Sequence, residues 1–227
     1  TRADGYFPPL RIMELKTIST ARTARYISLG EPGPDIQHVF FCLHGESQSL
    51  TDFAAQLVNF DTPERLLVLP EGLSRHALPA GPTETPATVA SWFAPDSLLP
   101  DLADLATYLD ELAATLLARC PIEVPVTVLG CGHGAAAACR WLAGGRTRYD
   151  RLLLYAPGFP AAIDRRATLV GLPERPVTLI STTTDAFTPE AAGAGLLQDL
   201  QDVGLSVQHR YVSEGPITLA ALGTVGK

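Results

Sequence analysis

One short stretch of the sequence has the spacing of a nucleophile elbow but carries no nucleophile. Residues 130–134 read Gly-Cys-Gly-His-Gly and follow an apolar run. In such an elbow a strand turns sharply into a helix, small residues stand two positions before and after the tip, and the tip residue attacks. Gly130 and Gly134 fill the small positions, so the tip is Gly132, which has no side chain. The pattern predicts an elbow that cannot attack a substrate.

The tip has Cys131 on one side, which is a candidate nucleophile in a shifted register, and His133 on the other. A shifted register would make Cys131 the tip, but it puts Leu129 and His133 where small residues are needed. His133 follows the tip, at the position where a backbone N–H would stabilise an oxyanion. We expect the His133 side chain to lie at the edge of a pocket without a catalytic role.

The elements that position this elbow follow from hydrophobic patterning. Continuous apolar runs are typical of strands buried on both faces, and apolar residues at helical spacing indicate amphipathic helices. The segments 10–18 and 24–29 alternate and predict an N-terminal hairpin, whereas 72–97 predicts a long loop. Further strands are predicted at 38–43, 65–70, 124–129, 151–155, 177–181 and 206–212, and helices at 50–60, 98–119, 135–142 and 190–203.

Strands that alternate with helices predict an α/β fold with a mostly parallel central sheet flanked by helices. We expect one domain over residues 1–227. Ligands of such sheets bind at the carboxyl ends of the strands, so any site should be built from the segments that follow them. These segments are 44–45, 71–72, 131–133, 156–159 and 182–185.

Composition excludes several classes of function. The net charge is −7 and the arginines are scattered, which argues against a nucleic-acid partner. No apolar run reaches the roughly 18 residues of a membrane span, and no signal peptide is visible. The four cysteines form no CxxC pair, so we expect reduced, buried thiols, no metal site, no cofactor and a cytoplasmic location. These cysteines are Cys42, Cys120, Cys131 and Cys139.

Several segments, taken in order, resemble the phospholipase/carboxylesterase group of α/β-hydrolases, especially its small bacterial predicted esterases. They are FCLHGESQSLTDF, RLLVLPEGLSRHAL with ASWF, VLGCGHGAAAACRWL, LLLYAPGFP and STTTDAFTPE. The similarity covers most of the chain from about residue 38. It implies the α/β-hydrolase fold and descent from enzymes that use a Ser-His-Asp triad.

The resemblance also implies that the triad is degenerate. Asp185 matches the acid, because Pro189 follows it at the family's spacing. Gly132 stands at the position of the serine and Pro216 at that of the histidine, and residues 210–227 contain no histidine. Two replacements are more than a deliberate knockout needs, so we expect a natural pseudoenzyme.

The loop after the first buried strand departs from the family as well. Glu46 and Ser47 stand where the family has an apolar or aromatic residue and then glycine. A Glu46 carboxylate that pointed inward would oppose a developing oxyanion, and one that pointed to solvent would not. The residues expected to line the pocket are His44, Gly45, Glu46, Ser47, Trp92, Cys131, His133 and Phe159.

Three hypotheses remain open. The first is a non-catalytic protein that binds a small molecule or a protein partner. The second is an active carboxylesterase or thioesterase for small acyl esters, which would use Cys131 with His133 or His44. The third is a structural subunit or homo-oligomer. The apolar tail 217–225 is either its interface or a terminal helix on the core, and we expect the helix.

Overall fold

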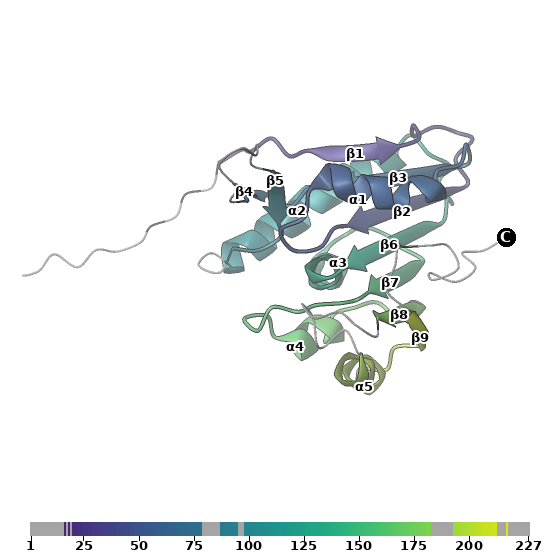
Figure 1. Cartoon of the computed structure of the whole chain (residues 1–227). Helices are drawn as coiled ribbons and strands as arrows, with labels where there is room; N and C mark the ends of the chain where they lie inside the picture. The colour runs from purple at the N-terminus through teal and green to yellow at the C-terminus, as the bar shows by residue number, and fades with distance from the viewer. Residues whose placement is uncertain are drawn as a thin grey trace, which may run out of the picture.

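The structure is a computed structural model that describes residues 16, 18, 20–78, 87–94, 98–182, 193–212 and 217. Its centre is a seven-stranded sheet with helices on both faces (Figure 1). The strands are β1 (Tyr26–Leu29), β2 (His38–Leu43), β3 (Arg65–Pro70), β6 (Val126–Cys131), β7 (Arg151–Tyr155), β8 (Val177–Thr182) and β9 (Val207–Val212). They lie in the order β1-β3-β2-β6-β7-β8-β9. β1 is antiparallel to β3 and all other pairs are parallel, so the predicted fold class is confirmed.

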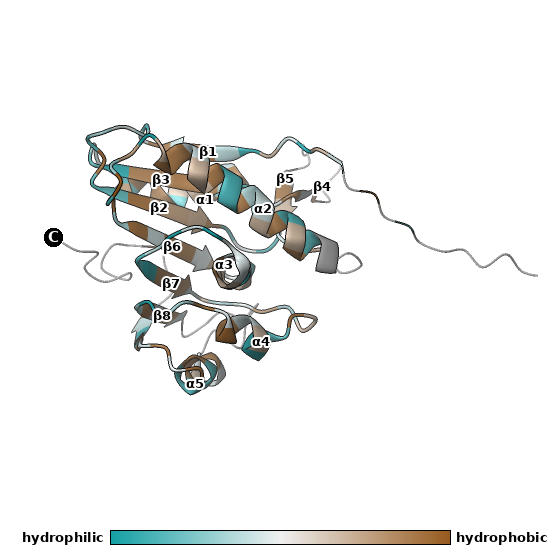
Figure 2. Ribbon diagram, turned by 180° about the vertical axis from the view of Figure 1, so that it is seen from behind, coloured by the Kyte–Doolittle hydropathy of each residue, from teal (hydrophilic) through white to brown (hydrophobic). Residues whose placement is uncertain are grey.

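Side chains alternate between the two faces of the buried strands and supply a separate core on each. In β2, Phe41 packs in the larger cluster, with residues of the helices α2 to α5, and Phe40 packs in the smaller one, with residues of α1. The period of two along a strand explains this division. Figure 2 shows the hydrophobic colouring along β2 and β3. The helices are α1 (Leu50–Leu57), η1 (Val58–Phe60), α2 (Leu98–Leu117), α3 (His133–Gly144), α4 (Arg165–Val170) and α5 (Ala194–Asp202).

The long helix has the apolar stripe that the sequence predicts. It ends at Leu117, two residues before the expected Arg119. The stripe faces the larger core, and its members are Leu102, Leu105, Leu109, Leu112 and Leu116. Within the part of the chain that the structure describes, no helix is long and apolar enough to cross a membrane.

Three short elements were not predicted. Residues 72–97, expected as a loop, contain β4 (Ser74–Ala77) and β5 (Thr88–Ser91), which pair antiparallel. Strands of four residues are too short to display a period, and β4 has no β-branched residue. The six-residue helix α4, which begins after Asp164, is also below the length that periodicity can detect.

The N-terminal hairpin is described only in part. Its second strand is present as β1, and the antiparallel partner of β1 in the sheet is β3. Most of its first strand, residues 10–15, lies outside the described residues, as does the tail apart from Ile217.

Candidate functional site

The predicted strand–turn–helix elbow is present between β6 and α3. Gly132 at its tip has φ +52° and ψ −126°, a conformation that side-chain-bearing residues rarely adopt. A Cβ at Gly134 would collide with the backbone carbonyls of Leu43 and His44, and one at Gly130 would lie 2.5 Å from the Cα of Ala135. The glycine spacing read from the sequence therefore reflects the close approach of β2, β6 and α3.

The tip is held by backbone hydrogen bonds from the neighbouring strand. The Gly132 N–H donates to the Tyr155 carbonyl in β7 at 3.1 Å. The Gly132 carbonyl accepts from the N–H of Gly158, in the loop after β7, at 2.9 Å. A Cβ built on Gly132 would lie 3.4 Å from the Cα of Gly45, an ordinary contact. The elbow thus has space for a small side chain and keeps its strained shape without one.

Three polar side chains meet beside the tip. Glu46 Oε2 is 2.9 Å from Nδ1 of His133, and Glu46 Oε1 accepts a 2.6 Å hydrogen bond from the Ser91 hydroxyl. The side chains of Glu46 and His133 are 41% and 28% exposed, so the pair is open to solvent. Partial burial acts to raise the pKa of Glu46, but the hydrogen bonds from His133 and Ser91 outweigh it and lower that pKa. Glu46 is therefore an anion at neutral pH, and it points across the elbow toward His133.

The β4–β5 hairpin brings Ser91 and a further histidine to this place. Gln48 and Ala90 exchange two backbone hydrogen bonds, of 3.3 and 3.1 Å, which join the loop after β2 to β5. Ser47, which has a φ of +47°, lies with its hydroxyl 3.3 Å from Nε2 of the exposed His76. Sequence reasoning missed Ser91 and His76, because no pattern indicated that 74–77 and 88–91 pair.

Two of the predicted pocket residues lie beneath the site instead of lining it. His44 is completely buried, with Nε2 accepting from the Gly72 N–H at 3.0 Å and Nδ1 2.7 Å from the Gly45 carbonyl. Trp92 is 2% exposed, stacks near His44 and donates from its indole to the His44 carbonyl at 2.8 Å. These two side chains support the loop, because all their polar groups are bonded inside the protein.

The remaining predicted residues have four different placements. Gly45 adjoins the tip, and its N–H donates to Oε1 of Gln48 at 2.7 Å. Cys131 is 7% exposed and its thiol has a pKa raised well above the usual value, mainly by burial. Phe159 packs against the edge of the larger core. Asp185 and Pro216 lie outside the described residues.

All five histidines of the chain are described, and only His133 adjoins the elbow tip in sequence. His38 lies at the opposite, amino-terminal end of its strand, bonded to Thr127, with a pKa lowered to about 4 chiefly by burial. His209 in β9 is 2.9 Å from the Ser181 hydroxyl in β8. No cluster of three or more His, Cys, Asp or Glu side chains suited to a metal ion occurs among the residues that the structure describes.

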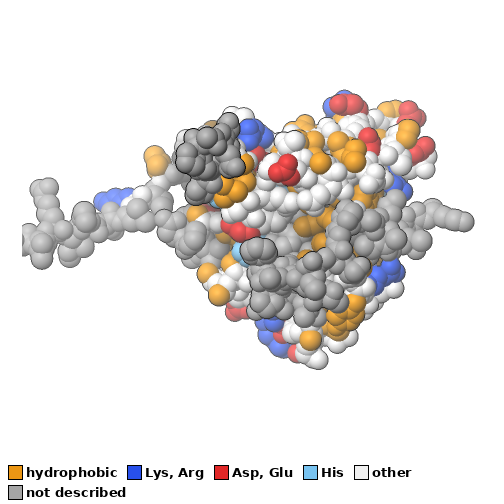
Figure 3. All heavy atoms as spheres, in the orientation of Figure 1, with side chains coloured by type: hydrophobic (Ala, Val, Ile, Leu, Met, Phe, Trp, Pro, Cys, Tyr) orange, Lys and Arg blue, Asp and Glu red, His pale blue; other side chains and the backbone are white. Residues whose placement is uncertain are grey.

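Figure 3 draws one face of the molecule with the charged side chains coloured. Lys and Arg side chains occur there in small separate groups, interspersed with Asp and Glu. Chemically, the site beside the elbow combines a fixed anion, a hydrogen-bonded imidazole and two hydroxyls around a tip without a nucleophile.

No family model matches the chain, and no curated protein matches it in sequence. Many solved structures match it in fold. Esterase PE8 is 16% identical with a TM-score of 0.61, over 87% of this chain and 93% of that one. Acyl-protein thioesterase 2 of Zea mays is 17% identical with a TM-score of 0.60, over 86% and 93%. A carboxylesterase from Mesorhizobium loti is 18% identical with a TM-score of 0.58, over 86% and 88%. The expected α/β-hydrolase fold is thereby confirmed.

Proposed function

We propose that this α/β-hydrolase-fold chain is a pseudoenzyme that has lost Ser-His-Asp catalysis and uses the space at its elbow to bind a ligand or a partner. The observation that carries the proposal is the pairing of an empty tip, Gly132, with the Glu46 anion fixed beside it. The first removes the nucleophile, and the second opposes the charge that acyl transfer must develop.

The effect of Glu46 can be given a magnitude. A unit negative charge about 4 Å from a developing oxyanion costs between about 1 kcal/mol in water and about 4 kcal/mol at an effective dielectric constant of 20. Because Glu46 is partly exposed, its cost lies toward the lower end of that range. This still amounts to about tenfold in rate, in addition to the loss of the covalent route.

The hypothesis of a rearranged esterase has little support in the geometry. A thiol attacks as the thiolate, and burial disfavours the thiolate of Cys131. Both nitrogens of His44 are already engaged, and Nδ1 of His133 is bonded to Glu46. His44 therefore has no nitrogen free to serve a Cys131 nucleophile. The contact with Glu46 leaves Nε2 of His133 open, so it is the burial of the thiol that disfavours a Cys131–His133 pair.

We also propose that the protein works in the cytoplasm and folds as one domain. All four cysteines are free thiols, which is the usual state in a reducing compartment. The alternative to a small ligand at the elbow is a protein partner or a second copy of the chain. Light scattering after size-exclusion chromatography shows whether the chain associates with itself.

The catalytic half of the proposal is tested by turnover. Purified protein is incubated with p-nitrophenyl acetate, p-nitrophenyl butyrate and a butyryl thioester, beside a Glu46→Gln variant. We expect no saturable hydrolysis from either protein, since removing the anion does not create a nucleophile. Saturable turnover by the native chain that Cys131→Ala abolishes would overturn the proposal in favour of a rearranged esterase.

The binding half is tested by amide chemical shifts. Butylamine, butyramide and butyrate are titrated into labelled protein, with the Gly132 and His133 amides as reporters. We expect butylamine to shift them most, because it is complementary to Glu46, and Glu46→Gln to remove that preference. If none of the three moves either amide, small-ligand binding at the elbow is refuted, and the protein-partner alternative stands.

A further inference from the structure

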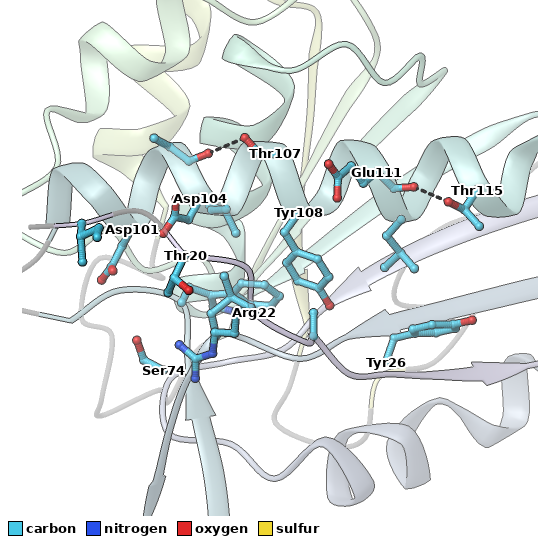
Figure 4. A pocket seen from close by; sticks show the side chains of 17 residues that line it. Thr20, Arg22, Tyr26, Ser74, Asp101, Asp104, Thr107, Tyr108, Glu111 and Thr115 are labelled. Carbon is cyan, nitrogen blue, oxygen red and sulfur yellow. Dashed lines mark hydrogen bonds between the residues drawn. The ribbon is translucent and has the colours of Figure 1, made fainter.

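A cavity lies away from the elbow, between the segment 18–26 and α2 (Figure 4). Its volume is about 710 Å³, within the roughly 300–1,000 Å³ that is usual for small-ligand sites. None of Glu46, Gly132 and His133 lines it. Nothing in the function proposed for the elbow uses this groove.

The two long walls of the groove follow simple periodicities. Every second residue of the segment contributes, which is the pattern of an extended chain showing one face. These residues are Ile18, Thr20, Arg22, Ala24 and Tyr26. The opposite wall is one stripe of α2, spaced three or four residues apart. Its residues include Asp101, Asp104, Leu105, Tyr108, Leu112 and Thr115.

The inner part of the groove is apolar and its hydrogen-bonding groups are already used. Leu105, Leu112 and Trp92 are buried and form its floor. The Tyr108 hydroxyl donates to the Arg25 carbonyl at 3.0 Å, so that the ring, and not the hydroxyl, is left for a ligand. An apolar group is the natural occupant of this part.

The rim carries charges of both signs that the protein leaves unpaired. Arg22, Asp104 and Glu111 are exposed, and none of them has an ion-pair partner among the described residues. In Figure 4 the Asp104 side chain comes from α2 and the Arg22 guanidinium reaches from the other wall toward Ser74. Asp101 differs, because its carboxylate accepts from the Ala94 N–H at 2.7 Å. Glu111 lines the groove about two helical turns after Asp104.

We propose that this groove binds a zwitterionic ligand with an apolar body, namely a short hydrophobic peptide or amino acid. Its ammonium group would pair with Asp104 and its carboxylate with Arg22, while its apolar side chains cover Tyr108, Leu105 and Leu112. A simple cation would pair with Asp104 and Glu111 but face Arg22 as a like charge, and a simple anion would pair with Arg22 but face both carboxylates. A zwitterion offers a group of each sign, which is why the observations favour it over a simple cation or anion.

The test is calorimetric titration with the dipeptide Leu-Leu, its N-acetyl derivative and its C-terminal amide. Arg22 and Asp104 are exposed, so solvent screens the pair that each forms with the ligand. We therefore expect each blocked peptide to bind about two- to fivefold more weakly than Leu-Leu. Arg22→Gln should weaken Leu-Leu and abolish the difference between acid and amide, and Asp104→Asn should abolish the difference between amine and N-acetyl.

Matched controls separate a built site from general charge effects. Arg119→Gln and Asp35→Asn change exposed residues of the same types that do not line the groove, and they should leave Leu-Leu binding unchanged. The proposal is overturned if Leu-Leu shows no saturable binding in the millimolar range. It is equally overturned if blocked and free peptides bind alike, or if the controls weaken binding as much as the groove variants do.

Discussion

The buried residues that support the elbow differ from the exposed residues at its mouth. In the support, His44 and Trp92 are buried and all their polar groups are hydrogen-bonded. The His44 carbonyl also lies so close to Gly134 that no Cβ fits there. At the mouth, Glu46 and His133 are partly exposed and pair with each other beside a tip that has no side chain. The packing that shapes an elbow is present, while the tip itself carries no side chain.

This difference shows that the elbow's shape does not depend on catalysis. Close packing of β2, β6 and α3 requires glycine at positions 130 and 134. This requirement is the same whether or not the tip residue carries a nucleophile. Substitutions beneath the elbow should therefore affect stability strongly, and substitutions at the mouth should affect it weakly. The following predictions test that contrast, from the largest expected effect to the smallest.

Gly134→Val should destabilise the protein by more than about 4 kcal/mol, because its Cβ would collide with backbone carbonyls of β2 and the following loop. Gly144→Ala is the matched control in the same helix, since nothing lies within 4 Å of the Cβ position there. Urea denaturation measures both. Similar stability of the two variants would refute the claim that close packing fixes the elbow.

His44→Ala should cost about 2–4 kcal/mol, because it leaves a cavity beside Trp92 and deprives the Gly72 N–H of its acceptor. His76→Ala at the exposed rim should change the free energy of unfolding by less than about 0.5 kcal/mol. Denaturant midpoints at constant slope give both values. A larger effect at His76 than at His44 would reverse the contrast between support and mouth.

Gly132→Ser should lower stability by about 1–2 kcal/mol, because the backbone at φ +52° strains any residue with a Cβ. Gly132→Ala should cost about the same, since the strain arises from the Cβ and not the hydroxyl. Thermal melts of the two variants and the native chain measure this. A rise in melting temperature for the serine variant would contradict the account of the tip.

Glu46→Gln should cost less than about 1 kcal/mol at pH 7, since the carboxylate is partly exposed. The folded-state pKa of Glu46 lies below its usual 4.5, so the anion's stabilisation is present above that pH. It is lost as pH falls through the folded-state pKa. The stability difference between native and variant should therefore vanish in acid, and a difference that grows on acidification would refute the hydrogen-bonded anion.

Sequence reasoning succeeded where a pattern was physically forced. Five strands of the central sheet, β2, β3, β6, β7 and β8, are largely buried, and their apolar runs predicted them within two residues at either end. The edge strand β9, which has no buried residue, was predicted within one residue. The elbow followed from glycines that close packing demands. Four-residue strands such as β4 and β5 leave no such pattern, and they went undetected.

The candidate site was predictable only in part for the same reason. The orientation of Glu46 was left open because its partner Ser91 arrives through the undetected β4–β5 pair. His44 was expected in the pocket because it follows a strand, and Trp92 because it lies in the long segment 72–97. Neither position distinguishes a residue that supports the site from one that lines it. Burial and hydrogen bonding make that distinction, and they appear only in three dimensions.

The most direct test of the central claim is the intact mass of the native protein after treatment with a fluorophosphonate, which labels activated serines in serine hydrolases. The account predicts no adduct, because Gly132 offers no hydroxyl at the elbow tip and Ser47 and Ser91 lie on the neighbouring loop and on β5 instead. An adduct of one phosphonyl group per chain, located by peptide mapping to Ser47 or Ser91, would contradict it.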